Sequence, residues 1–79
     1  MSNNEQYVCR NLETQEIVQL GDEVKSVKSG QLAIIEELIF PTMSHPRGFI
    51  IAKSAIADLK NFRAMYLPIA FNCEFELVN

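Results

Sequence analysis

Whether this chain is mainly helical or mainly β depends on "QLAIIEELIF" (residues 31–40), where large apolar side chains are dense. The segment can be scored as a helix with one apolar face, formed by Leu32, Ile35, Leu38 and Ile39. It can also be scored as a strand with two apolar faces, one buried by its own sheet and one by a partner. Residue preference does not decide, because Glu and Leu favour helix while Ile favours strand. We favour the strand, because the preceding Ser29-Gly30 is typical of a connection between hairpin arms.

Short apolar segments at close spacing surround this stretch, with Gly, Pro and Asn between them. We predict further strands over residues 6–10, 16–20, 23–28, 48–53, 64–71 and 73–78. Pro68 interrupts the predicted strand over 64–71, so the end of that strand is expected to be an edge or a bend. Residues 54–62 are the one predicted short helix, with Ser54 as its N-cap. Residues 1–5 are predicted to be disordered.

These elements predict one mainly-β domain over residues 1–79: a small SH3-like barrel or a strongly bent antiparallel sheet of five to six strands, with one short helix. A chain of 79 residues is near the lower limit for a single core. Its composition is 48% hydrophobic and only 22% charged, so part of the apolar surface cannot be hidden internally. We therefore expect a homo-oligomer.

Charge and segment patterns exclude several classes of partner. The net charge is −3 and no basic run occurs, which argues against nucleic acid. No stretch approaches the roughly 18 consecutive apolar residues of a membrane span. The N-terminus is polar and lacks the layout of a secretory signal, so we expect a cytoplasmic protein.

The residues that carry chemistry do not form a catalytic or metal-binding pattern. Cys9 and Cys73 with the single His45 would leave a zinc site incomplete, so we interpret the cysteines as reduced, buried and apolar. The paired carboxylates, residues 36–37 and 74/76, come with no catalytic partner or metal-ligand spacing. No phosphate-loop, nucleophile-elbow or metalloprotease motif occurs. We expect no enzyme activity, no cofactor and no metal.

The best candidate for ligand contact is "PTMSHPRGF" (residues 41–49), which we predict to be a hairpin connection. The guanidinium of an arginine suits phosphate or carboxylate, and a neighbouring glycine lets the backbone approach a ligand closely. Arg63, just past the predicted helix, could reach the same side of the sheet as this loop, and Tyr66 could stack on a base. The candidate ligand-binding residues are His45, Arg47, Gly48, Arg63 and Tyr66. The alternatives are a solvent-facing histidine, solvated arginines and a tyrosine that fills the core.

The order of motifs resembles that of a set of small, largely uncharacterised phage and prophage proteins, over residues 7–77. Their pattern is T-G-E, G-D-x-V and an F-R-G-like turn, then Pro, a Gly/Ser-rich turn, a V-x-V strand and aromatic-aromatic-Pro-x-x-Phe. The matching stretches are "ETQEIVQLGDEVKSVKSG" (13–30), "PTMSHPRGFII" (41–51) and "YLPIAF" (66–71). The matching residues are Thr14, Glu16, Gly21, Asp22, Val24, Gly30, Pro41, Gly48, Ile50, Tyr66, Pro68 and Phe71. Gln15 stands where the pattern has glycine, and residues 27–30 replace the F-R-G turn.

The resemblance implies an SH3-like β fold and a viral origin, but it brings no known activity. Two hypotheses follow. In the first, the protein is an oligomer that sequesters a small anionic ligand, such as a nucleotide signal, in the host cytoplasm and so counters host defence. In the second, it is an SH3-like interaction module that docks on a host or virion protein through its apolar surface.

Overall fold

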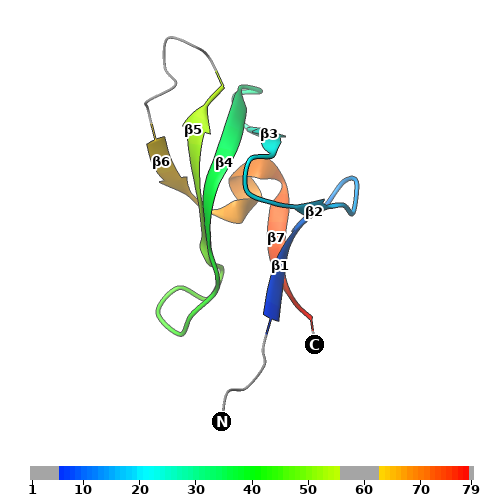
Figure 1. Cartoon of the computed structure of the whole chain (residues 1–79), viewed down its shortest axis with the longest axis vertical. Coiled ribbons are helices and arrows are strands. Elements are labelled where there is room, and N and C mark those ends of the chain that lie inside the picture. The colour runs from blue at the N-terminus through cyan, green and yellow to red at the C-terminus, as the bar shows by residue number, and fades with distance from the viewer. Residues whose placement is uncertain (1–5, 56–62, 79) are drawn as a thin grey trace.

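The computed structural model describes residues 6–55 and 63–78. Within these ranges, and in chain order, it contains the strands β1 (Gln6–Asn11), β2 (Ile17–Val18), β3 (Glu23–Lys25), β4 (Leu32–Ile39), β5 (Phe49–Ser54) and β6 (Arg63–Tyr66), the 3-10 turn η2 (Pro68–Phe71) and the strand β7 (Cys73–Val78) (Figure 1). The prediction of a mainly-β chain is confirmed. The segment 31–40 is a strand, as favoured above.

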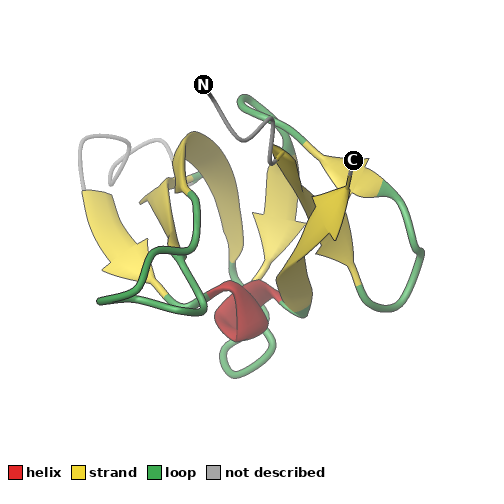
Figure 2. Ribbon diagram, turned by 90° about the horizontal axis from the view of Figure 1, so that it is seen from below, coloured by secondary structure: helices red, strands yellow, loops and turns green. Residues whose placement is uncertain are grey.

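The strands form two antiparallel sheets, in the orders β2-β1-β7 and β3-β4-β5-β6. The described strands number seven, as many as the predicted segments, but they form two sheets instead of one barrel or sheet of five to six strands; β2 belongs to one sheet and β3 to the other. The η2 turn lies between the two sheets (Figure 2). Within the described ranges no ladder joins β6 to β7, so the strands do not close into a barrel, which was one of the two expected architectures.

The chain between β6 and β7 explains why the sheets stay separate. The predicted strand over 64–71 ends at Tyr66, and Pro68 instead begins the η2 turn. Proline has no backbone N–H to donate to a ladder, but it is tolerated in the first turn of a helix. Asn72 ends the turn in the left-handed conformation, with φ 57° and ψ 42°. The strand prediction at 67–71 is therefore corrected to a helical turn.

The predicted helix over 54–62 lies mostly outside the described residues, as does the predicted disorder at 1–5. Ser54, its expected N-cap, is the last residue of β5. In the parts of the chain that are described, no helix has the length and hydropathy needed to cross a membrane.

Strand β4 contains a β-bulge at Glu36. Ile35 pairs with Ala52 and Glu37 pairs with Ile51, so two successive residues of β5 face three residues of β4. A bulge of this kind places one extra residue in a strand and bends it. Without it, strict alternation would turn one of two consecutive carboxylates toward the core, which costs several kcal/mol for an unpaired charge.

The core lies between the two sheets and draws on both. Ile35 and Ile50 are its largest fully buried aliphatic residues, and Leu38 packs against them on the far side of the bulge. Phe40 continues the apolar layer, with its ring edge-on to Phe75 at a centroid distance of 5.6 Å. The buried residues are Cys9, Val18, Val24, Ala33, Ile35, Ile50, Ala52, Phe71, Cys73 and Phe75.

Gln15 adopts a left-handed backbone conformation, with φ 67°. This is the position where the phage-like pattern has glycine. Non-glycine residues reach this region at a cost of roughly 1–2 kcal/mol, because Cβ crowds the following carbonyl. The side-chain amide of Gln15 donates to the carbonyl of Leu12 at 3.0 Å, which partly offsets that cost.

We expect Gln15→Gly to be more stable than Gln15→Ala by about 1 kcal/mol. Both variants lose the side-chain hydrogen bond, but only glycine adopts the left-handed backbone conformation without steric strain. Urea denaturation of the two variants measures the difference. Equal stabilities would contradict a strained left-handed residue at this turn.

Candidate functional site

The loop between β4 and β5 is a hairpin connection, as predicted, and it is held by its own hydrogen bonds. The backbone N–H of Thr42 donates to the carbonyl of His45 at 3.0 Å, and the N–H of His45 donates to the hydroxyl of Thr42 at 3.1 Å. The N–H of Gly48 donates to the same carbonyl at 3.0 Å. These three hydrogen bonds join the two ends of the loop to His45.

His45 is exposed and lies against the first residue of β5. Its ring meets Phe49 at a centroid distance of 4.9 Å and an interplanar angle of 64°. This edge-on contact fixes the ring at the surface beside Arg47 and Gly48. These three candidate residues line a common small pocket of about 180 Å³.

Gly48 is buried, and the chain itself makes the close approach that glycine permits there. Its φ is +70°, and a Cβ on it would lie 2.5 Å from the carbonyl oxygen of Ile39 and 2.8 Å from the ring of Phe75. The glycine therefore seats the loop against β4 and β7. A direct contact of Gly48 with a ligand stays a prediction.

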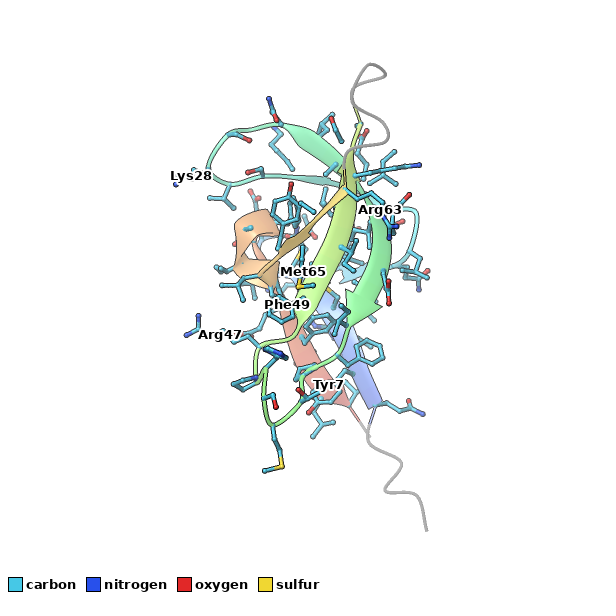
Figure 3. The ribbon with its side chains drawn as sticks, turned by 90° about the vertical axis from the view of Figure 1, so that its left-hand side faces the viewer. Tyr7, Lys28, Arg47, Phe49, Arg63 and Met65 are labelled. Carbon is cyan, nitrogen blue, oxygen red and sulfur yellow. The ribbon has the colours of Figure 1, made fainter. Side chains whose placement is uncertain are left out.

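Arg63 lies at the opposite end of the four-stranded sheet from this loop. It pairs in register with Lys53 near the end of β5, whereas the loop joins β5 at its start. Figure 3 shows Arg47 pointing outward from the loop and Arg63 at the start of β6, away from Arg47. The Arg63 guanidinium bonds Glu36 at 2.7 Å, and the Lys53 ammonium lies 3.2 Å from the same carboxylate. Arg63 therefore does not join His45 and Arg47.

Tyr66 packs against the core, as the alternative interpretation held. Its ring meets Phe71 at 5.0 Å and 69°, and it pairs in register with the fully buried Ile50. It lines a separate pocket of about 260 Å³ near Ser26 and Ser29. The five candidate residues are thus spread over three places, and only residues 45, 47 and 48 come together.

Beside this loop lies a larger groove of about 370 Å³, which we call the η2 groove, lined by residues 46–47, 67–69 and 73–75. Its floor is buried, with Pro68 and Phe75 among the residues there. Its walls are exposed: Leu67 keeps 42% and Ile69 keeps 55% of its surface. Arg47 contributes a positive charge, and Glu74 from β7 a negative one.

The sequence prediction missed the apolar wall and the acidic residue of this groove. Residues 67–69 were assigned to a strand, in which Pro68 would face the side opposite to Leu67 and Ile69. The signal for a helical turn was present, since Pro68 can start one and Asn72 favours the left-handed conformation that ends it. Glu74 was considered only as a carboxylate paired with Glu76; in the structure Glu76 forms an ion pair with Arg10 at 2.7 Å, and Glu74 lines the groove.

The two cysteines are reduced and buried, each with 1% of its surface exposed. A hydrogen bond from the Cys9 thiol lowers the pKa of Cys73, although burial acts in the other direction. The same hydrogen bond, together with burial, raises the pKa of Cys9 far above its usual range. Among the described residues no group of three or more His, Cys, Asp or Glu side chains could hold a metal ion.

The chain matches no family model, no curated protein and no solved structure. The resemblance to small phage proteins therefore stays a prediction.

We expect Gly48→Ala to destabilise the fold by about 2–4 kcal/mol, since the methyl group meets the backbone of Ile39 and the ring of Phe75 in addition to the left-handed strain. Gly30→Ala is the matched control: its φ is +76°, but a Cβ there meets nothing within 4 Å. The control should lose only about 1–2 kcal/mol. Similar losses in urea denaturation would show that Gly48 is not a packing position.

Glu36→Gln should cost about 0.5–1 kcal/mol at low salt, because it removes the charge shared by Lys53 and Arg63 at a partly exposed site. The loss should shrink in high salt, where exposed charges are screened. Glu37→Gln on the neighbouring position is the control and should change little. A salt-independent loss at Glu36 would contradict an electrostatic role for its carboxylate.

Proposed function

We propose that this chain is a non-enzymatic protein-interaction module, and that its η2 groove docks an extended segment of a partner protein. The observation that carries the proposal is the pair Leu67 and Ile69, exposed on the wall of a groove with a buried apolar floor. Exposed apolar side chains over a formed groove are typical of interaction sites.

The charges at the groove support an extended peptide as occupant. Arg47 and Glu74 both line it, and in the described part of the chain neither forms an ion pair. A segment with an apolar side chain against Leu67 and Ile69 could place an acidic group near Arg47 and a basic one near Glu74. Complementary charges of this kind set orientation and specificity more than affinity.

The groove is also held in shape before any partner arrives. Pro46 and Pro68 fix backbone torsions on two of its sides. The loop contains a hydrogen bond from the backbone N–H of His45 to the hydroxyl of Thr42. Gly48 lets the loop backbone pack directly against the ring of Phe75. Binding to a preformed surface loses less conformational entropy than binding that must order a loop.

The first hypothesis, sequestration of an anionic nucleotide, has less support. Glu74 puts a carboxylate in the same groove as Arg47. Arg63 is paired with Glu36, and the Tyr66 ring packs on Phe71 instead of offering a stacking surface beside the loop. A phosphate would therefore meet one cation and one repelling charge at the groove.

The SH3-like relationship and viral origin remain part of the proposal. The segment that serves both sheets through β2 and β3, and the 3-10 turn before the last strand, support an SH3-like strand order. The left-handed Gln15, at the position of a glycine in the phage-like pattern, supports that resemblance. Assembly as a homo-oligomer in the host cytoplasm stays a prediction.

The test is selection from a displayed library of random linear peptides, followed by affinity measurement with the enriched peptides. Ile69→Asp should weaken their binding at least about tenfold, because it places a charge against the apolar anchor. Leu20→Asp is the control: Leu20 is similarly exposed, at 62%, but lies outside the groove, so affinity should not change. Circular dichroism of both variants verifies their folding.

Two results would contradict the proposal. In one, selection on the native protein enriches no peptide that selection on the Ile69→Asp variant does not also enrich. In the other, adenine and guanine mononucleotides or cyclic dinucleotides bind, and the double variant Arg47→Ala/Arg63→Ala abolishes that binding. The second result would favour sequestration.

A further inference from the structure

The geometry points to Cys9 and Cys73 as a disulfide-forming pair that can link the first and last strands of the fold. Cys9 pairs with Phe75 in the ladder between β1 and β7, and Asn11 pairs with Cys73. The two cysteines are therefore diagonal neighbours on the core-facing side of adjacent strands. This inference does not depend on the occupant of the η2 groove.

The ladder and the core bring the two side chains together: both belong to one buried cluster, on adjacent strands in diagonal register. The Cys73 thiol donates a hydrogen bond to the carbonyl of Phe71 at 3.3 Å. Each thiol is 1% exposed, so neither has another thiol of this chain or bulk solvent beside it. This placement makes each the nearest partner of the other.

A low-molecular-weight disulfide such as glutathione disulfide supplies the oxidant. The Cys73 thiolate attacks one sulfur of glutathione disulfide, forming a mixed disulfide and expelling one glutathione thiolate. The Cys9 thiolate then attacks the Cys73 sulfur, forming the Cys9–Cys73 bond and expelling the second glutathione thiolate. Two protein thiols are oxidised, one glutathione disulfide is reduced, and both protons pass to the glutathione released.

Cys73 reacts first because the hydrogen bond from Cys9 favours its thiolate, and because of its position. It begins β7, which is an edge strand of the three-stranded sheet, whereas Cys9 lies on the central strand β1. Edge and terminal strands open locally at a lower free energy than central ones. Opening of β7 exposes Cys73, and reclosing brings the mixed disulfide back to Cys9.

The bond would close a loop that contains every strand between β1 and β7 (Figure 1). Long loops restrict the unfolded chain most, so the oxidised protein should be clearly more stable. We expect its midpoint of thermal unfolding to rise by at least about 10 °C.

The test is incubation of the native 79-residue chain with glutathione disulfide, followed by intact-mass measurement and peptide mapping without reductant. The expected product has lost two hydrogens and carries a cross-link between the peptides of Cys9 and Cys73. Dithiothreitol should restore both the mass and the original unfolding midpoint without denaturant.

Cys9→Ser and Cys73→Ser are the control variants. The proposal predicts that Cys9→Ser stops at the glutathione adduct on Cys73, while Cys73→Ser reacts far more slowly. Because either variant could be unstable, the mapping of the native chain is decisive by itself. Persistence of free thiols, a stable glutathione adduct on the native chain, a link between two chains, or a cross-link that leaves the unfolding midpoint unchanged would overturn the proposal.

Discussion

The alternation of side chains in β4 is the constraint on which the remaining structure depends. The strand must bury Ile35 and Leu38 against the other sheet while it carries Glu36 and Glu37 between them. These two requirements conflict in a regular strand, because successive residues face opposite sides. The bulge resolves the conflict because Glu37 pairs with Ile51 instead of facing the core, and the bulged Glu36 is bound by Arg63 at 2.7 Å.

Phe75 connects this core to the candidate binding surface. Its ring packs edge-on against Phe40 at the end of β4, and the same ring leaves no room for a side chain on Gly48. The loop therefore rests on the core directly, and Arg47 takes its position from that contact. Because Phe75 also lines the η2 groove, core packing sets the floor of the groove, while the exposed Leu67 and Ile69 form its wall.

The sequence predicts a strand and its bounds well where apolar and polar side chains alternate regularly. Where a strand departs from alternation, the sequence does not decide between strand and helix. The last strand, 73–78, was predicted with its observed bounds because every second residue at its start is apolar. The segment 31–40 was ambiguous for a physical reason: the bulge inserts one residue, so its apolar positions fit a helical spacing as well as a strand.

The site was less predictable than the fold, because sequence proximity does not fix which end of a sheet a residue reaches. Arg63 follows β5 closely in the chain, yet the antiparallel pairing places it opposite Lys53, away from the loop at the start of β5. Similarly, the aromatic character of Tyr66 fits a stacking surface or a core equally well. Which side of the sheet the Tyr66 ring faces depends on the pairing of Tyr66 with Ile50 on the neighbouring strand. The local sequence around Tyr66 does not reveal this pairing.

Pro68 links the open architecture to the groove. A closed barrel would require the chain after β6 to continue as a strand and to pair with β7, and a proline at this position cannot donate to such a ladder. The chain turns into η2 instead, which leaves Leu67 and Ile69 exposed, and no strand of the described ranges pairs with β7 on the side away from β1. The same residue that prevents closure of the sheets therefore creates the apolar wall, so a substitution that extended β6 would be expected to remove the groove as it completed the barrel.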